Sequence, residues 1–257
     1  GDLTYPYQSL NGSSEIIKDI VENNHKISNL IKDSKYPLII IGKSLLRSRS
    51  NKYVYESMKN FLIENNKISN EWNSLNILSN NASTVGSNDL DIISSTDSQN
   101  VALTKTLINE FEVLFLIGQD NLKFKKENEF VIYIGSHGDY GAECADIILP
   151  GATYAEQDGY FVNLEGKIQK AYKASYPPGV AKEDWEIINN LSELLKRKKI
   201  FNNREELVDS MFNYLNLKTE NNKHDLTEAT FVDEKILVDN FDYYFSNVIA
   251  RASKTMA

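Results

Sequence analysis

The sequence contains a single cysteine, Cys144, among 257 residues. A disulfide needs two cysteines and a cysteine-ligated iron–sulfur cluster needs several, so neither can form within this chain. The sequence also lacks any apolar run approaching the roughly 20 residues of a membrane-spanning helix. Its best apolar runs, 37–41 and 113–117, have the length of buried strands. The sequence therefore excludes a disulfide scaffold and predicts no membrane span.

Arginine is scarce as well. Only five of the 28 basic residues are arginine, and 36 acidic residues bring the net charge to −8. A nucleic-acid-binding protein needs a broad basic surface, which this balance does not provide. The preference for lysine, together with abundant asparagine, indicates an AT-rich coding source such as a mitochondrial genome.

Helical and extended patterns alternate along the first half of the chain. One helix is expected to begin at Ser13 or Ser14 and to extend to Ile31, because its apolar residues recur at spacings of three and four. Further helices are expected at 54–62 and 101–109, and strands at 36–41, 74–78, 113–118 and 130–134. Strand 36–41 is apolar throughout, so we expect both of its faces to be covered. Such alternation favours parallel strands with right-handed crossovers, and therefore an α/β fold.

Beyond residue 181 the pattern is helical and polar. An amphipathic helix is predicted at 182–196, with Trp185, Ile188, Leu191 and Leu195 on one face, and a second helix is expected to be capped by Asn203. Residues 218–234 are poor in apolar side chains, which indicates a surface arm or a mobile segment. The aromatic run 241–245 favours docking.

The stretch Gly135–Lys173, which we call the signature segment, has the pattern of a strand end followed by a long ordered loop. We predict an apolar run at 145–149, an extended stretch at 160–163 and a turn at 165–166 that leads into residues 167–172. Gly159 and Gly166 are expected to supply unusual backbone dihedrals, and Asn163 and Gln169 to hydrogen-bond the loop backbone.

The signature segment resembles the molybdopterin-oxidoreductase superfamily. The similarity rests on Ala145-Asp146-Ile147-Ile148-Leu149-Pro150, on Glu156, and on the element Phe161-Val162-Asn163-Leu164-Glu165-Gly166-Lys167-Ile168-Gln169. Within the superfamily the chain is most similar to the C-terminal domain of the large iron–sulfur subunit (75 kDa type) of respiratory complex I, NADH:quinone oxidoreductase. Further similarity lies in Gly135–Gly141, Pro177–Trp185, Pro37–Gly42 and Ile249–Met256.

This resemblance implies a doubly wound parallel-sheet domain that is incomplete in this chain. Its implied domain limits are 1–34 for an N-terminal helical segment, 35–200 for the α/β domain and 201–257 for a helix, a polar arm and a docking helix. It further implies that iron–sulfur clusters belong to a missing N-terminal region or to a partner chain. The chain is thus expected to be a fragment, a processed product or half of a split subunit, without a cofactor, metal or catalytic residue of its own.

Several residues still suggest chemistry and have structural alternatives. Gly42-Lys43-Ser44 resembles the end of a phosphate-binding loop, but Pro37 replaces the glycine that this pattern requires, so a strand-to-helix turn is favoured. His137 with Asp139 suggests a metal ligand or a general base, although one such pair makes no metal site. His25 and His224 lack ligand spacing.

The remaining candidates are Cys144, three carboxylates and a basic run. Cys144 is expected to be an inert buried thiol rather than a reactive one. Glu156, Asp158 and Glu165 suggest acid–base work, but they lack a third group and are expected to pack the loop. Lys196–Lys199 is expected to be a solvated helix end.

Three functions remain open. The first is a structural and assembly part of complex I in its peripheral arm, on the matrix side of the mitochondrial inner membrane or the cytoplasmic face of a bacterial one. The second is a fragment of an active molybdopterin-dependent oxidoreductase such as a formate dehydrogenase relative. The third is an unrelated α/β binding module. The first implies other complex I subunits as partners, especially the N-terminal iron–sulfur part of the same subunit.

Overall fold

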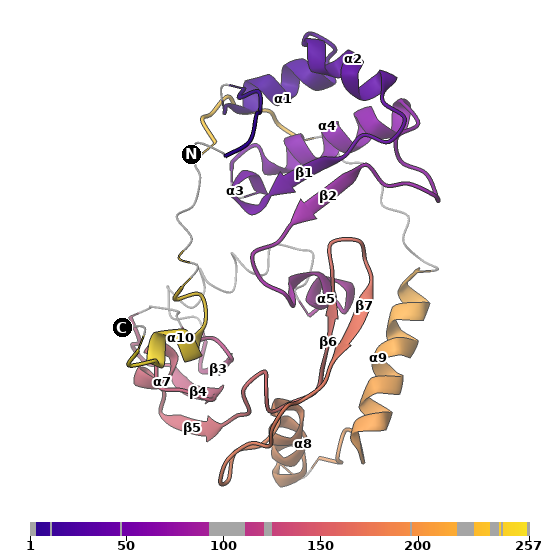
Figure 1. Ribbon diagram of the computed structural model, residues 1–257. Helices are drawn as coiled ribbons and strands as arrows, with labels where there is room; N and C mark the ends of the chain where they lie inside the picture. The colour runs from indigo at the N-terminus through magenta and orange to yellow at the C-terminus, as the bar shows by residue number, and fades with distance from the viewer. Residues whose placement is uncertain are drawn as a thin grey trace. The chain divides into compact units, whose positions relative to one another are not determined.

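The computed structural model describes residues 4–10, 12–46, 48–92, 111–120, 125–195, 197–219, 229–236, 242 and 244–255 (Figure 1). These residues form two compact units. The first holds the described parts of 1–82 and 223–240 with residues 164–166, and the second holds those of 83–163, 167–222 and 241–257. The domain limits expected after residues 34 and 200 concern the family's domains and stay a prediction.

In the first unit the predicted N-terminal helix is two helices, α1 (Ser14–Val21) and α2 (Lys26–Asp33). The expectation of one helix was wrong because Asn23 adopts a left-handed backbone with φ of 64°, which ends α1. His25 then begins α2 as its N-cap, where its Nδ1 accepts a hydrogen bond from the Ile27 amide at 3.2 Å. This histidine therefore has a structural role.

A small parallel sheet follows. Strand β1 (Ile39–Gly42) pairs with β2 (Leu75–Leu78), while α3 (Lys43–Leu46) and α4 (Asn51–Glu64) connect them. The core forms where α1 and α4 cover one face of this sheet, with buried Ile20, Ile41, Met58, Phe61, Leu62 and Leu75. The helix predicted at 54–62 and the strand predicted at 74–78 are both confirmed.

The other face of β1 is open in the described part of the chain, contrary to the expectation of a doubly covered strand. The side chain of Ile40 is 49% exposed, whereas that of Ile41 is only 4% exposed. Continuous apolar character signals that both faces can be buried. Helices α1 and α4 pack against the face that carries Ile41, and the described residues leave the face that carries Ile40 exposed.

The polar arm is ordered over residues 229–236, which lie along the first unit. The Ser14 hydroxyl donates to the Val232 carbonyl at 2.8 Å, and the Ser50 hydroxyl donates to the same carbonyl at 2.6 Å. The Glu234 carboxylate accepts from the Ser50 amide at 2.9 Å. Residues 229–234 of the predicted arm thus bond to the first unit, whereas 218–219 belong to the end of α9 (Arg204–Thr219) and 220–228 lie outside the described residues.

The second unit contains a parallel sheet in the order β3 (Val113–Ile117), β4 (Phe130–Gly135) and β5 (Ile147–Pro150). The strands β3 and β4 were predicted, whereas β5 lies where only an apolar run was predicted, and the parallel pairing is confirmed. One face packs Leu116, Val131 and Tyr133 against Ala142, Cys144 and Ala145. On the opposite face Val113, Phe115, Ile117, Phe130 and Ile147 are each at least 42% exposed.

An antiparallel hairpin of β6 (Gly159–Val162) and β7 (Ile168–Ala171) follows, with the predicted extended stretch as β6 and the predicted turn between the strands. Helix α5 (Thr84–Asp89) contacts β6. Gly166 in the hairpin turn has a φ of 79°, which favours glycine. Gly159 has no such left-handed φ, so the expectation for this residue was wrong: its backbone is part of β6.

Within the described ranges the other helices are α7 (Tyr140–Glu143), α8 (Asp184–Leu194), α9 (Arg204–Thr219) and α10 (Val248–Ala252). The predicted apolar face of α8 was wrong, because Ile187 and Asn189 are buried while Ile188 and Leu195 are exposed. Asn189 tolerates burial since its amide donates to the Phe201 carbonyl at 2.8 Å and accepts from the Ile200 amide at 2.7 Å.

Two further expectations concern helices. Asn203 caps α9 as predicted, because its side chain accepts from the Glu206 amide at 2.9 Å. The helix expected at 101–109 lies outside the described residues. Among the described helices, none has the length and apolar character needed to cross a bilayer.

Candidate functional site

The glycines of Gly135–Gly141 make room for one buried aromatic side chain. Tyr133 is 1% exposed, and its hydroxyl donates to the Asp120 carboxylate and to the His137 carbonyl, the latter at 3.1 Å. Burial and the Asp120 carboxylate raise the pKa of Tyr133 far above its ordinary value, so the phenol stays protonated. A Cβ on Gly141 would lie 2.5 Å from the Gln119 carbonyl oxygen and 2.9 Å from the Tyr133 ring. Glycine is therefore required there by packing.

The His137–Asp139 pair does not form. The Nδ1 atom of His137 faces the Ser136 hydroxyl at 2.9 Å. Asp139 instead caps α7 by accepting from the Tyr140 amide at 2.8 Å, and its second oxygen accepts from Arg251 Nε at 2.7 Å. The aspartate is thus bonded away from the imidazole and does not orient it.

Arg251 joins α10 to the signature segment. Besides Asp139, it donates through Nη1 to the Phe245 carbonyl at 3.1 Å. The two partners of the ion pair are largely shielded, with side-chain exposures of 22% for Arg251 and 13% for Asp139. Figure 1 shows α10 beside α7. The C-terminal segment therefore fastens onto the loop that precedes α7.

Replacing Arg251 by alanine is expected to lower the free energy of unfolding by about 1–3 kcal/mol, the usual cost of removing a partner of a charged hydrogen bond. Urea unfolding followed by circular dichroism measures this. Lys254→Ala is the matched control, because Lys254 is an exposed cation just beyond the same helix. If the two variants were equally stable, the ion pair between Arg251 and Asp139 would not stabilise the fold.

Asp146 in the Ala-Asp-Ile-Ile-Leu-Pro element aligns β5 with β4. Its carboxylate accepts from the Val131 amide at 2.7 Å and pairs with Lys126 at 2.5 Å. The Lys126 hydrogen bond, followed by the Val131 amide, lowers the pKa of Asp146. The neighbouring Cys144 is half-buried and donates to the Gly141 carbonyl at 3.3 Å. Desolvation raises the pKa of this thiol, which disfavours the nucleophilic thiolate.

The three acidic candidates act separately. Glu156 accepts from the Thr153 amide at 3.0 Å, and Asp158 accepts from the Lys173 amide at 2.8 Å. Glu165 lies exposed in the turn between β6 and β7. Asn163 also holds this turn by accepting from the Lys167 amide at 2.9 Å. Gln169 is exposed on β7 opposite Phe161. The structure thus brings no two of the three carboxylates together.

A cluster that the sequence did not reveal lies where the hairpin meets α8 and α9. Glu183 is 7% exposed and accepts hydrogen bonds from Lys173 Nζ at 3.2 Å, from Trp185 Nε1 at 2.9 Å and from Arg204. Arg204 also donates to the Asp158 carbonyl. We call Asp158, Lys173, Glu183 and Arg204 the ionic cluster. The available signal was the acidic pair Glu183-Asp184 before Trp185, but sequence alone does not indicate which of the two is buried.

Asp184 lies at the edge of this cluster at the start of α8. Desolvation, opposed by a hydrogen bond from Gln157 and reinforced by Glu183, raises the pKa of Asp184 from 3.8 to about 6. Asp158 differs: the Lys173 amide, Arg204 and the nearby lysines lower its pKa. Ionisation of Asp184 therefore lowers the stability of the fold, whereas ionisation of Asp158 raises it.

Asp184→Asn is expected to stabilise the chain at pH 8 relative to the natural chain. The folded state holds the Asp184 proton more tightly than the unfolded state, so this group's contribution to stability falls as pH rises from about 4 to about 6 and is flat above. The stability difference between variant and natural chain should therefore grow over that range. Asp158→Asn should show the opposite trend, and urea titrations at a series of pH values measure both. A difference that is constant with pH would contradict the assignment.

The other candidate positions are structural or undescribed. Gly42-Lys43-Ser44 is the junction of β1 and α3, as the structural alternative expected. Lys199 is exposed beyond α8 and pairs with Glu193 at 3.6 Å. His224 and Lys196 lie outside the described residues. Within the described part, histidine, cysteine and acidic side chains do not gather in groups of three that could hold a metal ion.

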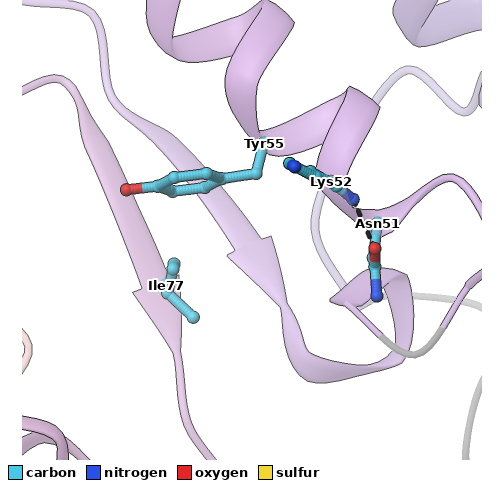
Figure 2. Close-up of a pocket in the computed structure, with 4 residues that line it drawn as sticks. All are labelled: Asn51, Lys52, Tyr55 and Ile77. Atoms are coloured by element: carbon cyan, nitrogen blue, oxygen red, sulfur yellow. Dashed lines mark hydrogen bonds between the residues drawn. The ribbon is translucent and has the colours of Figure 1, made fainter. Parts of the chain in front are cut away.

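A shallow pocket of about 260 Å³ lies on the first unit between α4 and β2. Figure 2 shows that Asn51, Lys52 and Tyr55 line it from the helix, with Ile77 on the strand. The Asn51 side chain accepts from the Lys52 amide at 2.5 Å. Among the described lining residues, none carries a carboxylate or an imidazole.

Comparisons with known proteins give consistent similarities over the whole chain. Residues 1–194 match the family described as molybdopterin oxidoreductase, and residues 213–257 match the C-terminal family of the G subunit of NADH-ubiquinone oxidoreductase. The NADH-ubiquinone oxidoreductase 75 kDa subunit of Reclinomonas americana is 34% identical over 267 residues, which cover 100% of this chain and 38% of that protein. The G subunit of NADH-quinone oxidoreductase from Rickettsia felis is 35% identical over 272 residues, with coverages of 99% and 38%. The chain thus spans just over a third of the length of these relatives.

Proposed function

The chain belongs to the molybdopterin oxidoreductase family, and we propose that within it the chain is a structural and assembly part of the large iron–sulfur subunit of a respiratory complex I. The match to two successive regions of that kind of subunit, in their natural order, supports this branch of the family. It also makes an unrelated α/β module with a convergent loop untenable.

The proposal rests on one observation: polar side chains of the signature segment bond to the backbone of the chain itself. Asp139, Asp146, Glu156 and Asn163 each accept a backbone amide of the same chain, and Asp158 accepts that of Lys173. Side chains that fasten their own loop are suited to holding a rigid shape. The ion pair from Arg251 to Asp139 further joins the two matched regions.

Exposed apolar sheet surface supports a partner for this part. In the second unit Val113 and Phe115 on edge strand β3 are 51% and 42% exposed. Large exposed apolar faces and unpaired strand edges usually mark contacts with other polypeptides. We propose that the parallel strands belong to a doubly wound sheet that the remainder of the same subunit completes, and that the chain is poorly stable alone.

The finer parts of the proposal follow from this role. The chain would hold no cofactor, metal or catalytic residue, and electrons from NADH would pass through iron–sulfur clusters elsewhere in the subunit or in a partner chain. The partners would be other complex I subunits in the peripheral arm. The location would be the matrix side of the mitochondrial inner membrane, or the cytoplasmic side in a bacterium.

Native purification through a tag on this chain tests the proposal. Mass spectrometry of the co-purifying proteins should identify NADH dehydrogenase subunits, and metal analysis of the same sample should show iron without molybdenum or tungsten. Stoichiometric molybdenum or tungsten with a pterin would overturn it in favour of an active molybdopterin-dependent oxidoreductase. A matched purification of the Arg251→Ala chain should recover fewer subunits than one of the Lys254→Ala chain.

A further inference from the structure

A cavity of about 550 Å³ lies within the second unit, between α9 and the start of the β6–β7 hairpin. Ligand pockets in proteins commonly have volumes of roughly 300–1,000 Å³ and apolar walls with a few polar groups. This cavity has that composition. Leu207 and Met211 contribute apolar wall from α9, and Asp184 contributes a carboxylate from α8.

Aromatic side chains from four separate places in the unit line the cavity. These are Tyr160 of β6, Trp185 of α8, Phe201 from the connection between α8 and α9, and Tyr214 of α9. Two of them are held in place: the Trp185 indole donates to Glu183 at 2.9 Å, and the Tyr160 ring packs edge-on against Phe212 with centroids 5.4 Å apart. Fixed aromatic faces attract cations through their ring electrons.

The charges around the cavity leave one carboxylate without a cationic partner in the described structure. Arg204 and Lys173 both pair with Glu183, and Arg204 also lies 4.0 Å from the Asp158 carboxylate. Lys170 also acts on Asp158, but among the described residues none of these three cations is paired with Asp184. Asp184 has a neutral partner in Gln157. A desolvated carboxylate is costly unless a cation compensates it.

We propose that this cavity binds an organic ammonium group on an apolar stem, with Asp184 as the counter-ion and the aromatic side chains around the alkyl groups. Arg204 also lines the cavity, but its guanidinium is paired with Glu183 and lies 4.0 Å from the Asp158 carboxylate. The charged residues of the described lining are Asp158, Asp184 and Arg204, so the lining keeps a net negative charge. This chemistry can come from a free small amine or from a lysine side chain of a neighbouring polypeptide. The site is independent of the structural role proposed above.

Trp185 supplies a direct readout, because the chain contains only two tryptophans. In a Trp72→Phe chain the fluorescence reports on Trp185 alone. Choline is the probe, and 3,3-dimethylbutan-1-ol is its uncharged counterpart of the same shape. Choline should change the fluorescence saturably, and the neutral alcohol should bind at least tenfold more weakly. Absence of saturable choline binding, or equal binding of the two, would overturn the proposal.

Asp184→Asn separates binding from folding. This variant should weaken choline binding at least tenfold, although it is expected to be more stable than the natural chain at pH 8, so unfolding cannot explain the loss. Glu186→Gln makes the same charge change further along α8, outside the cavity lining, and should leave binding unchanged. Unchanged affinity in Asp184→Asn would contradict the assigned counter-ion.

The same titration on the natural chain within its purified assembly distinguishes the two sources, with isothermal calorimetry replacing fluorescence. Binding to the assembly with the affinity of the chain alone indicates a free ammonium ligand. Binding to the chain but not to the assembly indicates that a neighbour's lysine already fills the cavity. Both results require the ammonium site, whereas a failed co-purification of complex I subunits would affect only the proposed assembly role.

Discussion

Glu183→Ala is expected to lower the free energy of unfolding by about 3–5 kcal/mol, the usual cost of breaking a buried ion pair by removing one partner. Glu183 is 7% exposed and accepts from Lys173, Trp185 and Arg204. Its removal leaves the partly buried Lys173 and the Trp185 N–H without this acceptor, and leaves Arg204 with Asp158 alone. Urea unfolding at neutral pH, followed by far-ultraviolet circular dichroism, measures the loss.

Two comparisons identify the cause of that loss. Glu186→Ala removes a half-exposed carboxylate from the same helix and should cost far less. Glu183→Gln keeps the side-chain shape and an acceptor oxygen, so it should recover part of the stability. If Glu183→Ala cost no more than Glu186→Ala, the ionic cluster would not hold the hairpin to α8 and α9.

Gly141→Ala is expected to destabilise the chain by about 3 kcal/mol, at the upper end of the cost of overpacking a filled site. The added Cβ would meet the Gln119 carbonyl oxygen at 2.5 Å and the Tyr133 ring at 2.9 Å. Tyr133 cannot easily give way, because it is buried and its hydroxyl is bonded to Asp120 and His137. Thermal unfolding should show a lower midpoint.

Gly138→Ala is the control for Gly141→Ala within the same loop. A Cβ on Gly138 would meet no atom within 4 Å, and its φ lies outside the left-handed region. Alanine there should be neutral, or slightly stabilising through the reduced entropy of the unfolded chain. Equal destabilisation by both variants would show that the loop needs flexibility rather than the space around Tyr133.

Local sequence patterns predicted most of the secondary structure. The strands at 74–78, 113–118 and 130–134 and the β6–β7 hairpin formed where apolar runs and glycine punctuation predicted them. These strands and the hairpin depend on short-range preferences, because a short apolar run between turn residues has few alternatives to a strand. The prediction of a single N-terminal helix was wrong because the spacing of apolar residues does not reveal the left-handed backbone of Asn23.

The candidate site was the less predictable part. The sequence located the signature segment and anticipated that Asn163 bonds to the loop backbone. It did not pair Asp139 with Arg251, which lies 112 positions away, nor Glu183 with Arg204. Such pairs depend on which elements pack together, and charged residues at a distance leave no periodic pattern that marks them as partners.

The sequence by itself determined the family, the strands and the exclusion of an internal cysteine-ligated cluster, because these depend on residue identity and short-range pattern. Only the tertiary structure decided which carboxylates are neutralised and which is left beside an aromatic cavity. The physical reason is that the energy of a charge depends on its surroundings: Asp158 and Asp184 are the same residue type, yet their pKa values shift in opposite directions.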